Sequence, residues 1–313
     1  MINRGTNGLS ASIHWSDWQE RRNRERVIAE EQGRSTFVDW ADHPTILAEV
    51  FSRAFGSPEY DFFDYISDHL PSWRSAHVLS LGCGDGAFER ELISRGLASK
   101  ITGLDVSPAR VEAAKQSSSS FADRLDFQCA DLDQGDLWAG PFGGVIAKSS
   151  LHHVAGLERL GEALLRAVHP QSMMLAIDFF GPTRFQWSDL QLELANEFIR
   201  HSIPNDLRQL PVGGLAPPAT RMSPQDLIAL DPSEAVRSGD LMRWLNDLLE
   251  IREVKPLGGT LLNLVFYGPV VNNFVPGLKE HDDIVREASH LEASLIDAGI
   301  LPSDFQLVLG RFR

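Results

Sequence analysis

The chain contains, at residues 78–87, the sequence VLSLGCGDGA, in which a short apolar strand runs into a glycine-rich turn. Glycine permits the tight backbone that brings N–H groups close to a ligand. Gly82, Gly84 and Ala87 match the dinucleotide fingerprint, and Asp105 follows about 20 residues later, where a ribose-binding acid belongs. The alternative is an ordinary turn without a ligand. The stretch therefore predicts a strand, a turn and a helix at a nucleotide-cofactor site.

Short apolar segments alternate with helical segments on both sides of this turn. We expect strands at 77–81, 101–104, 125–129, 144–147 and 173–179, and helices at 88–95, 108–116 and 157–168. This alternation predicts a parallel, doubly wound sheet with right-handed crossovers. Ligands bind such sheets at the carboxyl ends of the strands, so the glycine turn should lie at the binding edge.

The flanking segments have a different pattern. Before the core we expect helices at 19–32 and 44–55 and an aromatic-rich segment at 60–70. After residue 180 we expect a helix at 188–201, an irregular loop at 204–222, and a helix that begins at Ser223 and Pro224. A strand at 251–255, an amphipathic helix at 283–298 and a strand at 305–310 complete the pattern.

Four segments resemble the motifs of class I S-adenosylmethionine-dependent methyltransferases, in the family's order. Leu81–Gly86 resembles the first motif, although Ser80 stands where many relatives have an acid, and Asp85 is a candidate replacement. The other three are the sequences TGLDVS at 102–107, CADL at 129–132 and KSSLHH at 148–153. The resemblance covers residues 75–180 well and 240–313 more weakly. Segments 181–187, 231–238 and 258–262 resemble a subgroup of bacterial small-molecule methyltransferases.

The resemblance implies an α/β, Rossmann-like, seven-stranded doubly wound sheet whose last strand is antiparallel. The implied organisation is an N-terminal helical cover (1–72), a cofactor-binding core (73–181), a mainly helical insertion or lid on the substrate side (182–250), and the remaining strands and helices of the sheet (251–313). It also implies S-adenosyl-L-methionine as cofactor. Asp105 would accept from the ribose hydroxyls, Val106 would pack on the adenine, Asp131 would accept from its amino group, and Leu132 would donate its N–H. The implied cofactor-binding residues are Gly82, Cys83, Gly84, Asp85, Asp105, Val106, Asp131, Leu132, Lys148 and Ser149.

Candidate catalytic residues follow the fourth and fifth expected strands. Methyl transfer from a sulfonium is an in-line displacement that needs positioning and, for a hydroxyl acceptor, a base. His152 and His153 are adjacent, so at most one should face the methyl group; the alternative is that one contacts the cofactor and the other packs. Asp178 is the second candidate base, or it orients a loop.

Candidate substrate-binding residues lie just after the fifth strand. Arg184 could bind a carboxylate or phosphate, or pair with a local acid. Gln186 and Trp187 could line the acceptor pocket, and packing is the alternative for Trp187. Four aromatic residues could form a lid, a cover over the sheet, or a contact between two copies in a homodimer; they are Trp15, Trp18, Trp40 and Phe51.

Composition narrows the partners. The 313 residues include 43 acidic and 29 basic side chains, a formal net charge of −14, which argues against nucleic acid or an anionic membrane as partner. There is no signal-peptide pattern and no apolar run of about 20 residues, so we expect a cytoplasmic protein. The two cysteines form no CxxC pair. Asp131, Asp133 and Asp136 could be imagined as metal ligands together with His152 or His153. We nevertheless expect no metal, because no acidic pair follows strand four. The carboxylates after strand three also have a role available in binding the adenine.

The predicted activity is methyl transfer to a small or medium-sized acceptor, first of all a hydroxyl of a sugar or natural product, with N- or C-methylation close behind. Residues 148–151 lack the N/D-P-P-Y tetrapeptide of base amino-group methylation. A non-catalytic cofactor-binding scaffold or regulatory subunit is the alternative from another class. An NAD-dependent oxidoreductase is a third.

Overall fold

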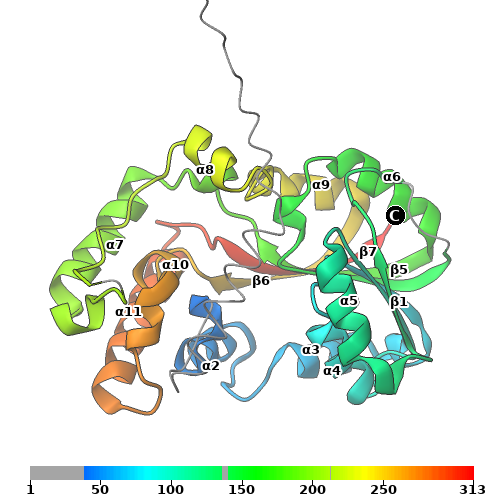
Figure 1. Ribbon diagram of the computed structural model, residues 1–313, viewed down its shortest axis with the longest axis horizontal. Coiled ribbons are helices and arrows are strands. Elements are labelled where there is room, and N and C mark those ends of the chain that lie inside the picture. Colours follow the sequence, from blue (N-terminus) through cyan, green and yellow to red (C-terminus); the bar gives the residue numbers. More distant parts are fainter. Residues whose placement is uncertain (1–38, 136–139, 212) are drawn as a thin grey trace, which may run out of the picture.

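The computed structural model describes residues 39–135, 140–211 and 213–313. Its centre is a seven-stranded sheet in the order β3-β2-β1-β4-β5-β7-β6 (Figure 1). The strands are β1 (His77–Leu81), β2 (Lys100–Asp105), β3 (Leu125–Cys129), β4 (Phe142–Lys148), β5 (Val168–Phe179), β6 (Leu249–Gly258) and β7 (Phe305–Phe312).

The pairing of the strands confirms the predicted fold. Strands β1 to β5 are joined by parallel pairs, and β7 is antiparallel to both β5 and β6. Leu81 of β1 pairs with Leu104 of β2 and with Ala147 of β4, so the carboxyl ends of these strands coincide. The segments after these strands therefore meet at one edge, as the sequence predicts.

Helices cover both faces of the sheet and form a second group beside it. They are α2 (Pro44–Phe55), α3 (Phe62–His69), α4 (Ala87–Ser94), α5 (Pro108–Ser117), α6 (Leu157–Ala167), α7 (Asp189–Ser202), α8 (Pro224–Leu230), α9 (Leu241–Leu248), α10 (Leu262–Val265) and α11 (Lys279–Asp297). Val78 and Ile146 pack with α3 and α4, whereas Leu79 and Val145 pack with α6 and α9. Figure 1 shows α6 and α9 above the sheet and α3 and α4 below it.

The sequence missed α9, which falls inside the expected insertion 182–250. Its buried residues Leu241, Trp244, Leu245 and Leu248 belong to the core on the α6 face. Their spacing is amphipathic, but a helix of eight residues is too short for periodicity to mark clearly.

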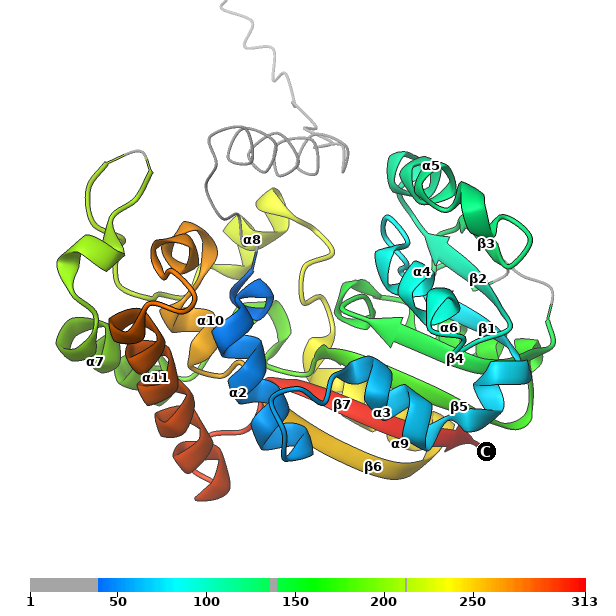
Figure 2. The same ribbon diagram turned by 90° about the horizontal axis from the view of Figure 1, so that it is seen from below.

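The segments outside the core form a second group of helices. Figure 2 shows α2 between α11 and the sheet, and α7 and α10 lie on the side of α2 that faces away from the sheet. Trp40 packs edge-on against Phe305, with ring centroids 5.2 Å apart, and Phe51 packs against Phe62 at 5.1 Å. Trp15, Trp18 and the expected helix at 19–32 lie outside the described residues. None of the helices within the described ranges is long and apolar enough to cross a membrane.

Candidate active site

The glycine turn after β1 contacts the loop after β4. Gly82 has φ +69°, and a Cβ on it would lie 2.3 Å from the Cβ of Ser150. The Ser150 hydroxyl donates to the carbonyl of Leu81 at 2.7 Å. Glycine is therefore required at position 82 both for its backbone conformation and for the close approach of the two loops.

Asp105, at the end of β2, holds the glycine turn. Its two carboxylate oxygens accept from the backbone N–H of Gly84 at 2.8 Å and of Ser107 at 2.9 Å. The next residue, Val106, is 50% exposed, which is unusual for an apolar side chain directly after a buried strand. An anchored carboxylate next to an exposed apolar side chain fits the ribose and the adenine face of an adenosine group.

The other implied cofactor residues lie along the same edge. An oxygen of Asp131 accepts from the N–H of Asp133 at 2.9 Å, and Leu132 beside it is half-buried. Lys148 ends β4, and the N–H of Ser149 donates to the carbonyl of Ile177 in β5. Their roles toward a cofactor stay predictions.

A buried carboxylate from α4 lies next to Ser80, the position at which the first motif lacks an acid. Ser80 donates its hydroxyl to Oε1 of Glu89 at 2.5 Å, and Glu89 is only 2% exposed. Burial raises the pKa of Glu89 to about 7. Asp85, the candidate replacement, accepts from the N–H of Ala87 at the exposed start of α4, and its role toward a cofactor stays a prediction. Glu89 could have been noticed in the sequence, because it is a charged residue on the face of α4 that also carries the buried Leu92 and Ile93.

His152 and Asp178 form a buried pair where β4 and β5 end. Nδ1 of His152 lies 2.5 Å from Oδ1 of Asp178, whose Oδ2 accepts from the N–H groups of Ser150 and Leu151, each at 2.8 Å. Burial by itself lowers the pKa of His152, but the neighbouring carboxylates of Asp178 and Glu234 outweigh it and raise this pKa. Burial acts to raise the pKa of Asp178, but His152 and the backbone donors lower it. Each member of the pair therefore favours the charged form of the other.

His153 has different partners. Its Nδ1 lies 3.0 Å from the hydroxyl oxygen of Ser233, and that hydroxyl donates to Asp231 at 2.9 Å. Burial and the neighbouring His152 lower the pKa of His153 to about 3, so this ring is neutral. Because the Ser233 proton points to Asp231, the Ser233 oxygen accepts from Nδ1–H of His153.

The loop before α9 brings Glu234 to the two histidines. Oε1 of Glu234 lies 3.5 Å from Nε2 of His152. The sequence placed Glu234 in a segment typical of the subgroup but gave it no role, because nothing local connects position 234 with position 152.

Arg184 fixes this loop. Its guanidinium donates to the carbonyls of Glu234 at 2.9 Å and Pro232 at 2.8 Å, and its N–H donates to the carbonyl of Ala235. Gln186 donates to the carbonyls of Arg184 and Met222, and Trp187 stacks on Phe185 with ring centroids 5.1 Å apart. The substrate roles of Arg184, Gln186 and Trp187 stay predictions; the contacts just given hold the walls of the site together.

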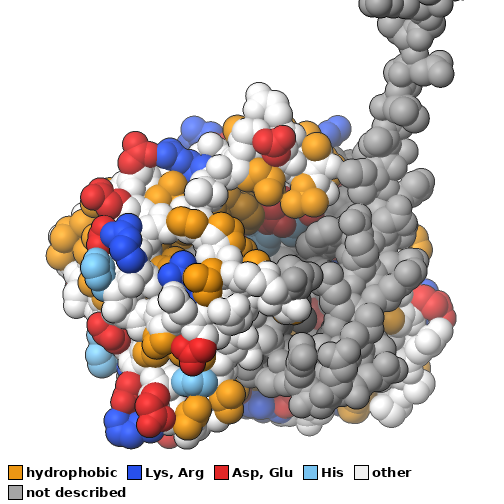
Figure 3. All heavy atoms as spheres, turned by 60° about the vertical axis from the view of Figure 1, so that its left-hand side comes forward, with side chains coloured by type: hydrophobic (Ala, Val, Ile, Leu, Met, Phe, Trp, Pro, Cys, Tyr) orange, Lys and Arg blue, Asp and Glu red, His pale blue; other side chains and the backbone are white. Residues whose placement is uncertain are grey.

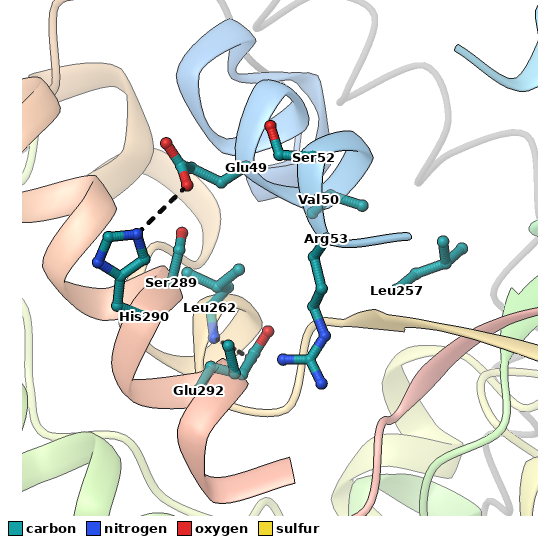
Figure 4. A pocket seen from close by; sticks show the side chains of 10 residues that line it. Glu49, Val50, Ser52, Arg53, Leu257, Leu262, Ser289, His290 and Glu292 are labelled. Carbon is teal, nitrogen blue, oxygen red and sulfur yellow. Dashed lines mark hydrogen bonds and ion pairs between the residues drawn. The ribbon is translucent and has the colours of Figure 1, made fainter. Parts of the chain in front are cut away.

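A pocket of about 260 Å³ lies away from this edge, between α2 and α11 (Figure 4). Glu292 at its base accepts from the N–H groups of Gly259, Leu261 and Leu262, and so holds the chain before α10. An ion pair of 3.8 Å between His290 and Glu49 lies at its side. These polar groups already serve the fold, so the pocket is not the candidate active site.

On the face of the molecule shown in Figure 3, neither basic nor acidic side chains predominate. Basic, acidic and hydrophobic side chains alternate there, and acidic and histidine side chains are visible in a hollow. Small-molecule sites combine apolar walls with a few convergent polar groups, and the cluster of His152, His153 and Glu234 has this character.

Comparison with known proteins identifies the core. Residues 78–171 match the family described as "Methyltransferase domain". A malonyl-[acyl-carrier protein] O-methyltransferase 1 from Ilyobacter polytropus is 33% identical over 92 residues, which is 26% of this chain and 33% of that protein. A ubiquinone biosynthesis O-methyltransferase from Coxiella burnetii is 28% identical over 96 residues, which is 31% of this chain and 40% of that protein. The chain thus spans well under half the length of these curated relatives.

Solved structures add a weak likeness. An S-adenosylmethionine-dependent methyltransferase from Mesorhizobium loti is 17% identical with a TM-score of 0.46, over 79% of this chain and 95% of that one. The family match shows a methyltransferase domain over residues 78–171, as the four motifs predict.

Proposed function

We propose that the chain transfers the methyl group of S-adenosylmethionine to a hydroxyl group of a small molecule. The observation that carries this proposal is the buried pair of His152 and Asp178, which lies where β4 and β5 end and next to the glycine turn. The names of the two curated relatives, both O-methyltransferases, support oxygen as the acceptor atom.

The residues at the ends of β1 to β3 would hold the cofactor. Asp105 and Val106 fit the adenosine group, and the turn from Gly82 to Gly84 brings backbone close to it. Glu89 places a buried carboxylate beside that turn. When bound, the cofactor supplies an electrophilic methyl group.

The cluster of His152, Asp178 and Glu234 would assist the acceptor. A hydroxyl becomes a strong nucleophile only as it loses its proton. His152 lies between two carboxylates, at 2.5 Å from Asp178 and 3.5 Å from Glu234, so the cluster favours positive charge next to the acceptor oxygen. A positive charge there would stabilise the oxygen anion that forms as the hydroxyl loses its proton to water.

The test is turnover with methyl-labelled S-adenosylmethionine and a panel of sugar nucleotides, phenols, hydroxy acids and amines. We expect label in a methyl ether, with little turnover by Asp105→Ala and unchanged turnover by Asp126→Ala, which removes an exposed carboxylate on β3. Transfer only to nitrogen or carbon, or cofactor binding without turnover across the panel, would contradict the proposal; the second result would favour a non-catalytic scaffold.

A further inference from the structure

Three ligand-type side chains converge beside the proposed acceptor site. His152, His153 and Glu234 each offer one ligand atom, and these atoms all lie within 4.8 Å of one another. No other group of three or more His, Cys, Asp or Glu residues within the described part of the chain is arranged in this way.

We propose that His152, His153 and Glu234 bind a divalent first-row transition-metal ion, such as Zn²⁺ or Mn²⁺. The proposal rests on the proposed function and deepens it, because an ion on Nε2 of a neutral His152 would replace the proton there as the positive charge beside the acceptor. It departs from the sequence-based expectation of no metal, which considered the carboxylates after β3 and not Glu234.

The hydrogen bonds of the two rings assign the ligand nitrogens. Nδ1 of His152 is held by Asp178 and Nδ1 of His153 by Ser233, which is itself held by Asp231. Nε2 is therefore the ligand nitrogen on each ring. Metal-binding histidines almost always engage a carboxylate, carbonyl or similar acceptor through the other ring nitrogen, which fixes the ring and its tautomer.

The distances fit a shared ion. Ligands about 2.1 Å from a tetrahedral ion lie about 3.4 Å from each other. Nε2 of His152 and Oε1 of Glu234 are 3.5 Å apart, so this edge is already near the required length. The two distances to His153 are at most 4.8 Å, and an ion would require them to shorten by about 1.4 Å or less.

The donor set selects the type of ion. Two imidazoles and one carboxylate suit zinc, iron or manganese, whereas calcium and magnesium prefer oxygen ligands alone. Three protein ligands leave at least one position open for a water molecule or an oxygen of the acceptor. An ion there would lower the pKa of a bound hydroxyl, which is the task that the proposed function gives to this cluster.

The test is metal binding by the full, untagged chain after treatment with a chelator. Calorimetric titration with Zn²⁺, and elemental analysis after gel filtration, should give one ion per chain. Glu234→Gln and His153→Ala should each weaken binding at least 100-fold, and Asp178→Asn should weaken it about 10–100-fold, since it removes an outer partner. Glu234 is only partly buried, so Glu234→Gln should fold, as circular dichroism would verify.

A matched control lies on α7. His201 and Glu197 also form a histidine–glutamate pair, 3.1 Å apart, but the pair is exposed and belongs to no group of three ligand residues in the described part of the chain. His201→Ala should leave the affinity unchanged. Absence of stoichiometric binding by the wild-type chain, or equal binding by the wild type, Glu234→Gln and His153→Ala, would overturn the metal site. Methyl transfer by a chain that binds no ion would overturn the metal site while leaving the proposed function in place.

Discussion

Replacement of Glu89 by glutamine should stabilise the protein at alkaline pH. Glu89 is 2% exposed, and its Oε1 accepts from Ser80, while its Oε2 has no hydrogen-bond partner among the described residues. A buried carboxylate with one donor is poorly compensated for the water it loses. Glutamine resembles the protonated acid in shape, in its acceptor oxygen and in its lack of charge.

The size of the effect follows from the pKa. Folding raises the pKa of Glu89 from 4.5 to about 7, and each pKa unit corresponds to about 1.4 kcal/mol. For an acid whose pKa is raised by folding, stability is highest below the unfolded pKa and is lost as pH rises through the folded pKa. Between pH 4.5 and 7 the wild type should therefore lose up to about 3 kcal/mol at this one group.

Urea unfolding followed by tryptophan fluorescence measures this difference. At pH 8, Glu89→Gln should be more stable than the wild type by up to about 3 kcal/mol, which shifts the midpoint by about 1 M or more. At pH 5 the difference should fall to about 0.8 kcal/mol. Burial also raises the pKa of Asp304 to about 7. Because Asp304 is present in both proteins, its effect on stability cancels in the comparison. Glu112→Gln, an exposed change on α5, should have no effect at either pH. Equal stability at pH 8, or the same gain at both pH values, would refute the reasoning.

Three further substitutions test the site. Asp105→Ala should weaken S-adenosylhomocysteine binding by about 100-fold or more in calorimetry, because hydrogen bonds to a charged group contribute about 1.5–3 kcal/mol each; unchanged affinity would contradict the assignment of this loop. Asp178→Asn should lower kcat by about 10²–10⁴-fold with cofactor affinity largely retained, and an unchanged kcat would remove His152 from the reaction. Gly82→Ala should destabilise the fold by about 2–5 kcal/mol, from backbone strain and the clash with Ser150. Gly96→Ala, with φ +67° and open space around it, should cost only the strain, and equal losses in urea unfolding would show that the clash is absent.

The sheet could be predicted because each strand is short, apolar and bounded by turn residues. The expected strand 125–129 is identical to β3, and the expected strand 77–81 is identical to β1. The prediction was too short for β5, which begins at Val168 rather than residue 173. Residues 169–171 are exposed, so their side chains carry no apolar signal, although backbone pairing of Val168 with Phe142 lengthens the strand. Backbone hydrogen bonds form whether or not the side chains are apolar, and sequence patterns do not record them.

Residues of the candidate site could be predicted only where they follow apolar strands in the sequence. Asp105, His152 and Asp178 were predicted as site residues because each lies at the end of an apolar strand or shortly after it. Glu89 and Glu234 were not assigned a role, because their significance depends on contacts between elements that are distant in the chain. Glu234 meets His152 only after the loop before α9 folds back over the carboxyl edge of the sheet.

Arg184 shows why that loop reaches the site. Its side chain binds two backbone carbonyls, those of Pro232 and Glu234, and its own N–H binds a third, that of Ala235. A guanidinium held in this way cannot be recognised from the sequence, because backbone carbonyls occur at every position. It also sits at φ +57°, a conformation that costs a non-glycine residue energy and persists only where its surroundings impose it. The loop that follows β5 is thus fastened to the loop that carries Ser233 and Glu234. The position of Glu234 relative to His152 is therefore set by Arg184, which acts on the site through the backbone.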